Sequence, residues 1–182
     1  MSDPDRWLPG VRRLDPESLG AVYDALSPAL FRYAFRLLGD GRTAEDVVAE
    51  TFSRLLAAIR NGGGPQVYLG AYLYRIAHNL TANWHRDSHR RREVPLDDHT
   101  HTIRHGEQPE AALVKNEEIE GLLESIRRLP DDRQNLLILK FVERMSNEEI
   151  AHIMGRSEGA IKSLYHRTLL SLRDDLGKSK GD

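Results

Sequence analysis

The chain has 182 residues, a formal net charge of −2 and no cysteine, so disulfides, thiolate metal ligands and cysteine nucleophiles are excluded. The near-neutral charge argues neither for nor against nucleic acid as a partner. No apolar run approaches the roughly 20 residues that span a bilayer, and the acidic start is unlike a signal peptide, so we expect a cytoplasmic protein.

The apolar pattern predicts an all-α protein made of two small helical domains joined by a flexible linker. Apolar residues recur at helical spacing, and no segment shows the alternation typical of strands. Residues 14–92 are expected to form the first domain and residues 111–176 the second. Residues 93–110 have no apolar period and are rich in Asp, His and Thr, which is typical of a linker.

Capping residues and proline predict the helix boundaries in the first domain. We interpret Ser27 and Pro28 as the cap and first residue of a helix that ends at Gly39. Thr43 lies three residues before Asp46, as in a capping box, so the next helix is predicted to begin there. Its inward residues should be Val47, Val48, Thr51, Phe52, Leu55, Leu56 and Ile59. Those of the following helix should be Leu69, Tyr72, Leu73, Ile76, Ala77 and Leu80.

The second domain contains the pattern of a helix-turn-helix. Ser146 and Glu149 form a capping box before a short helix that Gly155 closes, and Ser157 can cap the next helix. In such motifs the second helix lies in the DNA major groove; the alternative is a helical hairpin that only packs. Its outward residues are polar, small or basic, namely Glu158, Gly159, Lys162, Ser163, His166 and Arg167. Its inward stripe is predicted as Ile161, Leu164, Tyr165, Leu169 and Leu172.

A second candidate surface for nucleic acid lies along residues 72–92. Aromatic faces can stack on unpaired bases, amides can read base edges, and arginines can hold phosphates. These residue types occur together as Tyr72, Arg75, Asn79, Asn83, Trp84, Arg86 and Arg90. The alternative is a packed helix with a solvated basic end.

Acidic residues follow Thr43 on the same predicted helix. Asp46 and Glu50 are four residues apart and share a face, whereas Glu45 lies in the first turn, where the helix dipole favours negative charge. The face is either simply solvated or a docking surface for a basic partner.

Histidines and catalytic motifs indicate no specific chemistry. His99, His101 and His105 lie in the expected linker, and His85 and His89 are four residues apart, but neither set has the spacing of a tetrahedral site. The chain has no Walker loop, no dinucleotide fingerprint and no nucleophile elbow. We therefore expect no metal, no cofactor and no enzymatic activity.

Three of these segments together resemble extracytoplasmic-function sigma factors of bacterial RNA polymerase. Residues 43–52 resemble the family's conserved region 2 motif, residues 72–92 its promoter-melting segment, and residues 129–172 its region 4. The resemblance implies a non-catalytic subunit that binds core RNA polymerase, directs it to promoter DNA and is held off by an anti-sigma factor.

The resemblance also implies roles for matching positions. Docking on the β′ clamp helices would involve Asp46, Glu50 and Phe52, and the polymerase β flap is a second expected contact. Opening and reading of the −10 element would involve Tyr72, Arg75, Asn79, Asn83, Trp84, Arg86 and Arg90. Reading of the −35 element would involve Glu158, Lys162, Ser163, His166 and Arg167.

The chain departs from the family pattern at several positions. Ala49 stands where the family often has Gln, and Asn83 where Asp is usual. Leu164, Thr168 and Leu170 stand where the −35 helix commonly carries Lys or Arg. Two alternative functions are a stand-alone helix-turn-helix regulator, which would bind duplex DNA without polymerase, and a sigma mimic that sequesters an anti-sigma factor.

Overall fold

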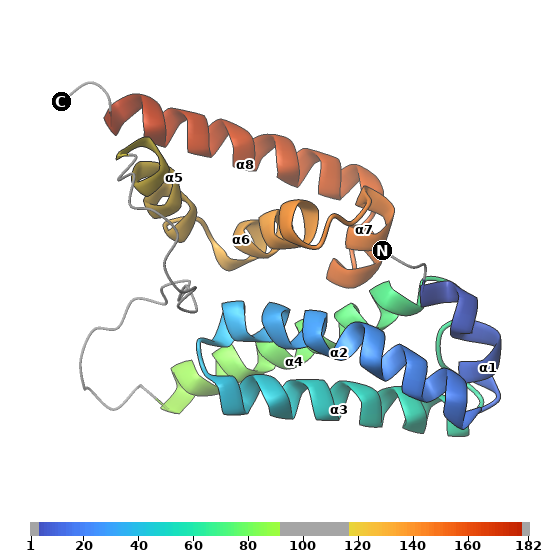
Figure 1. The fold of residues 1–182 in the computed structure, drawn as a ribbon. Helices are drawn as coiled ribbons and strands as arrows, with labels where there is room; N and C mark the ends of the chain where they lie inside the picture. The colour runs from blue at the N-terminus through green and yellow to red at the C-terminus, as the bar shows by residue number, and fades with distance from the viewer. Residues whose placement is uncertain (1–3, 92–116, 180–182) are drawn as a thin grey trace. The chain divides into compact units, whose positions relative to one another are not determined.

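The computed structural model describes residues 4–91 and 117–179, and within these ranges all regular elements are helices, which confirms the all-α prediction. The predicted linker lies outside the described residues. The chain forms two compact units. The N-terminal unit contains η1 (Pro4–Trp7), α1 (Leu8–Arg12), α2 (Pro16–Leu38), α3 (Gly41–Arg60) and α4 (Leu69–Arg91) (Figure 1). The C-terminal unit contains α5 (Glu117–Arg127), α6 (Asp131–Leu137), η2 (Ile138–Val142), most of α7 (Asn147–Met154) and α8 (Glu158–Ser179).

The N-terminal unit is a bundle in which α2, α3 and α4 pack against one another. Leu30 and Tyr33 on α2, Leu55 on α3 and Leu73 on α4 are fully buried. Tyr33 also meets Tyr74 of α4 edge to face, with ring centroids 5.3 Å apart. Burial of such large apolar side chains is the main favourable term in folding, and here it fixes the three helices as one body.

Helix α2 runs without a break through Pro28, so the predicted interruption at Ser27 is wrong. Proline removes one backbone N–H and crowds the carbonyl four residues earlier, here that of Asp24. Both Pro28 and Asp24 are exposed, so water can solvate that carbonyl. The buried stripe of Val22, Leu26 and Leu30 keeps helical spacing across the proline, and its packing keeps α2 continuous.

Helix α3 begins three residues earlier than predicted, because its cap is Asp40 and not Thr43. The Asp40 carboxylate accepts hydrogen bonds from the Thr43 amide, at 2.8 Å, and from the Thr43 hydroxyl. Asp15 caps α2 in the same way, accepting from the amide of Ser18 at 2.9 Å. The hydrogen bonds from the Thr43 and Ser18 side chains and amides hold the pKa of Asp40 and Asp15 below the ordinary value of 3.8.

The C-terminal unit packs α5 and α6 against α8 around Leu129, Leu137 and Leu172. Gln134 of α6 closes the end of α5, since its side-chain amide donates to the carbonyls of Arg127, at 3.1 Å, and Leu129, at 2.7 Å.

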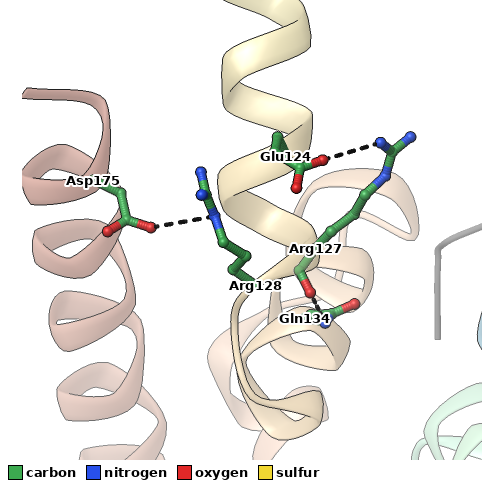
Figure 2. A network of polar contacts seen from close by, with 5 residues as sticks. All are labelled: Glu124, Arg127, Arg128, Gln134 and Asp175. Carbon is green, nitrogen blue, oxygen red and sulfur yellow. Dashed lines mark hydrogen bonds and ion pairs between the residues drawn. The ribbon is translucent and has the colours of Figure 1, made fainter. Parts of the chain in front are cut away.

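Two ion pairs flank this junction. Arg128, just beyond the end of α5, lies 4.0 Å from Asp175 of α8, and Glu124 pairs with Arg127 at 3.4 Å within α5 (Figure 2). All four side chains are at least partly exposed, so these pairs contribute little stability compared with the leucine core.

Candidate functional site

Helices α7 and α8 form the predicted helix-turn-helix, with boundaries at the expected residues. The Glu149 carboxylate accepts from the Ser146 amide at 2.8 Å, and the Ser146 hydroxyl accepts from the Glu149 amide at 3.2 Å, which is a reciprocal capping box. Gly155 closes α7 in the left-handed region, at φ +63°. The Ser157 hydroxyl accepts from the Ala160 amide at 3.2 Å and caps α8.

Side-chain bonds tie this motif to the preceding helices. Arg156, in the turn between α7 and α8, pairs with Asp132 of α6 at 3.1 Å. Lys140 of η2 donates to the side-chain oxygen of Asn147, at the start of α7, at 2.8 Å. These contacts link the turn before α8 to α6, and the start of α7 to η2.

The outer face of α8 carries the five residues predicted to read the −35 element. All of them are exposed, namely Glu158, Lys162, Ser163, His166 and Arg167. Lys162 pairs with Glu158 at 2.8 Å, and the side chain of Arg167 donates to the carbonyl of Ser163 at 3.3 Å. The face therefore offers cationic and hydroxyl groups that are ordered along one helix.

The inward stripe of α8 differs from the prediction. Of its predicted residues, Tyr165 is only half-buried. Leu169 was expected inside but is 41% exposed, whereas Thr168 is fully buried. The Thr168 hydroxyl donates to the carbonyl of Leu164 at 2.8 Å, so its burial leaves no unpaired polar atom. Leu164 is buried as well. The departures from the family at Leu164 and Thr168 therefore concern the core and not the face offered to DNA.

Four of the residues predicted to act at the −10 element form a stripe along α4. Tyr72, Arg75, Asn79 and Asn83 follow one another at helical spacing, with Tyr72 half-buried and the other three exposed. Trp84 beside them is 46% exposed. Arg86 and Arg90 belong to α4, but their side chains lie outside the described residues.

The buried face of α4 is rotated relative to the prediction. Tyr74 and Thr81 are buried, whereas Tyr72, Ile76 and Leu80 are only half-buried. The packing of α4 against both α2 and α3 decides which apolar residues lie inside. As a result, the stripe that contains Tyr72 is accessible from solvent.

The acidic residues of α3 also lie on the surface. Glu45, Asp46 and Glu50 are exposed, and Glu50 pairs with Arg54 at 2.7 Å. Phe52 was expected to be inward, but it is half-buried.

An aromatic residue that sequence reasoning missed lies beside this face. The ring of Tyr23 from α2 is 4.9 Å from that of Phe52, centroid to centroid, and is 49% exposed. Its neighbour Val22 is fully buried, so the packing of α2 on α3 decides which of these two adjacent residues is exposed.

The described residues contain no cluster of three or more His, Asp or Glu side chains that could hold a metal ion. None of the helices in these ranges is long and apolar enough to cross a membrane. The histidines of the expected linker, and the side chains of His85 and His89, fall outside the described part.

Comparison with known families identifies both halves of the chain. The Sigma-70 region 2 model matches residues 22–92, and the Sigma-70 region 4 model matches residues 119–172. The sigma factor BldN of Streptomyces coelicolor is 33% identical over 94% of this chain and 66% of that protein. The chain belongs to the extracytoplasmic-function sigma factors.

A second sigma factor is similar in sequence, and two solved structures share the fold. The sigma factor YlaC of Bacillus subtilis is 29% identical over 90% of this chain and 95% of its own. CnrH, solved with the cytosolic domain of CnrY, has the same fold with a TM-score of 0.67 at 19% identity, covering 97% of this chain and 99% of that one. The sigma factor RpoE of Bartonella quintana, solved with the anti-sigma factor NepR, matches with a TM-score of 0.62 at 23% identity, covering 85% and 94%.

Sigma factors of this family are non-enzymatic transcription factors, and region 4 is their DNA-binding helix-turn-helix. The helix pair α7–α8 is thus the region 4 motif, and α3, α4 and α2 from residue 22 onward fall within the region 2 match.

Proposed function

We propose that this sigma factor binds core RNA polymerase and directs it to promoters through three surfaces, one on each of α3, α4 and α8. The main support for the proposal is the set of exposed side chains on the outer face of α8. A capped helix-turn-helix, braced by Arg156 and Asp132, offers five exposed polar or basic side chains at the end of the helix that enters DNA in such motifs. The chain acts as a non-catalytic subunit, in the cytoplasm with polymerase and DNA.

The α8 outer face (Glu158, Lys162, Ser163, His166 and Arg167) binds duplex DNA at the −35 element. Lys162 and Arg167 contact phosphates, which supplies affinity and register. Ser163 and His166 face the base edges, where hydroxyl and imidazole groups can donate or accept hydrogen bonds. Because Lys162 is already paired with Glu158, it must exchange that partner for a phosphate, which lowers its net contribution.

The α4 stripe (Tyr72, Arg75, Asn79 and Asn83) captures unpaired bases of the −10 element. The half-buried ring of Tyr72 offers a stacking surface, Arg75 a phosphate contact, and the two amides hydrogen bonds to base edges. Trp84 lies beside this stripe and is exposed, and Arg86 and Arg90 follow it later in α4. Capture of unpaired bases offsets the cost of opening the duplex, which makes this surface a melting element.

The α3 acidic face (Glu45, Asp46 and Glu50) docks on the β′ clamp helices of the polymerase. The exposed carboxylates attract a basic partner surface, while Phe52 and the adjoining ring of Tyr23 supply apolar contact area next to them. Region 4 makes a second contact with the polymerase, at the β flap.

An anti-sigma factor regulates the chain by covering these surfaces. The proposal is supported by the two similar structures, CnrH and RpoE, each of which was solved with a protein partner. In the C-terminal unit, Phe141 and Val142 at the end of η2 are exposed apolar side chains, with Phe141 58% exposed. In this proposal they supply apolar contact area to the partner.

The test separates the three steps by one variant each. Asp46→Lys should weaken association with core polymerase, Lys162→Ala with Arg167→Ala should weaken binding of the holoenzyme to duplex promoter, and Arg75→Ala should slow promoter opening after binding. Association is measured by fluorescence anisotropy, duplex binding by filter retention, and opening by 2-aminopurine fluorescence. The proposal fails if the variants share one defect at the same step or behave as wild type.

A further inference from the structure

Helix α4 begins without a capping residue of its own. The residues just before it, 64–68, are Gly-Pro-Gln-Val-Tyr and include no Ser, Thr, Asp or Asn. The first amides of a helix have no partner within the helix, and these four residue types are the ones that usually accept from them. By contrast, α2 and α3 are capped by Asp15 and Asp40, immediately before each helix.

The missing cap comes from Asp5, in the η1 segment 63 residues earlier in the chain. Its carboxylate accepts from the amide of Tyr68, at 2.8 Å, and from the amide of Leu69, at 2.6 Å. Oδ2 accepts from Tyr68 and Oδ1 accepts from Leu69, so each carboxylate oxygen accepts from one amide. A carboxylate is favoured at this end of a helix by the helix dipole as well.

Two further contacts fix the same junction. A Cβ added to Gly70 would lie 3.6 Å from Cγ of Pro4, so η1 lies directly against the first turn of α4. Tyr68 has φ +55°, a left-handed conformation that is costly for any residue other than glycine. Such a backbone persists only where its surroundings hold it, and the Asp5 carboxylate is one of the groups that do so.

We propose that Asp5 is a positioning residue for −10 capture, through its hold on the start of α4. The amide of Tyr72 donates to the carbonyl of Tyr68 at 2.9 Å, so the first residue of the α4 stripe is set by the junction that Asp5 fixes. If the backbone of a binding surface is already ordered before DNA binds, binding does not have to offset the entropy lost by ordering it. This inference rests on the proposed role of the α4 stripe.

The experiment compares Asp5→Ala with Asp15→Ala, which removes a cap of the same chemistry from α2. Each holoenzyme is titrated with a fluorescent single-stranded oligonucleotide that carries the −10 sequence of a promoter selected by the wild-type holoenzyme. Asp5→Ala removes both charge-assisted hydrogen bonds and should weaken oligonucleotide binding about tenfold, because only part of their contribution reaches the α4 stripe, while core affinity stays within about twofold. Asp15→Ala should leave oligonucleotide binding within about twofold of wild type.

Two additional measurements keep the result interpretable. Asp5→Asn, which keeps one acceptor oxygen, should bind with intermediate affinity, and tryptophan fluorescence checks that each variant is folded. In the free protein, amide hydrogen exchange at Tyr68 and Leu69 should be faster in Asp5→Ala than in Asp15→Ala. Equal exchange in both would overturn the cap itself.

The outcomes separate this inference from the proposed function. Wild-type holoenzyme that fails to bind the oligonucleotide contradicts the role of the α4 stripe, and with it any positioning role. Wild-type binding that Asp5→Ala leaves unchanged, or that Asp15→Ala weakens equally, overturns the role of Asp5 alone.

Discussion

Replacement of Pro28 by alanine tests the continuity of α2, the helix on which α3 and α4 pack. If α2 runs through Pro28, alanine restores an N–H that can donate to the carbonyl of Asp24 and removes the crowding of the pyrrolidine ring. Because Pro28 is exposed, the change creates no cavity. Proline is about 3 kcal/mol less favourable than alanine inside a helix, so we expect Pro28→Ala to raise the free energy of unfolding by about 1 to 3 kcal/mol.

Urea unfolding followed by tryptophan fluorescence measures this change in the N-terminal unit, which contains α2. The chain has two tryptophans, and both Trp7 and Trp84 lie in the N-terminal unit. With a urea dependence of about 1 to 3 kcal/mol per molar, the unfolding midpoint should rise by roughly 1 M.

The effect of Ser27→Ala on stability has opposite signs for a continuous α2 and for a helix that starts at Pro28. Within a continuous α2, Ser27→Ala should stabilise the N-terminal unit by a few tenths of a kcal/mol, because alanine forms helix more readily than serine. If Ser27 instead capped a new helix at Pro28, the same change would cost about 1 kcal/mol. Loss of stability in both Ser27→Ala and Pro28→Ala would refute the continuous helix.

Three more predictions follow from the surface and core assignments. Lys162→Ala should weaken promoter binding at all sequences alike and lower the slope of log affinity against log salt by about 1, measured by titration between low and physiological salt. Thr168→Lys should destabilise the C-terminal unit by about 2 to 4 kcal/mol, because it buries a charge, whereas Leu169→Lys should change stability by under about 0.5 kcal/mol. Unfolding curves followed by circular dichroism measure both changes, and equal effects would contradict the orientation of α8. Since the pKa of Asp40 is lowered below 3.8 by its bonds from Thr43, its contribution to stability is present above pH 3.8 and lost as the pH falls through the folded pKa. Asp40→Asn, which keeps a capping acceptor, should therefore flatten the fall in stability below about pH 4, and an unchanged acid limb would count against this cap.

Local signals were sufficient to predict the helix-turn-helix. Its capping box at Ser146 and Glu149, the turn at Gly155 and the cap at Ser157 each depend on residues within three or four positions of one another. Such interactions are encoded in the nearby sequence, and tertiary packing does not need to be known. All six residues expected to face outward on α8 are exposed, Gly159 among them.

Other features depend on packing between distant segments and could not be predicted in this way. The choice of Thr168 over Leu169, or Tyr74 over Tyr72, as the buried residue is set by the helices packed on α8 and α4. Pro28 after Ser27 is typical of a helix start, and only the helical spacing of Val22, Leu26 and Leu30 across it indicates one continuous helix.

The cap of α4 is the extreme case, because its acceptor lies 63 residues away in the sequence. No local pattern links Asp5 to Tyr68, and only the fold of η1 onto the N-terminal unit brings them together.

In vitro transcription with sigma-free bacterial core polymerase and a pool of genomic promoter fragments tests whether this protein directs polymerase to promoters. We expect defined transcripts that require this protein, with start sites downstream of a shared pair of −35 and −10 sequences. Absence of such transcripts, together with failure of the protein to co-purify with core polymerase, would contradict this role.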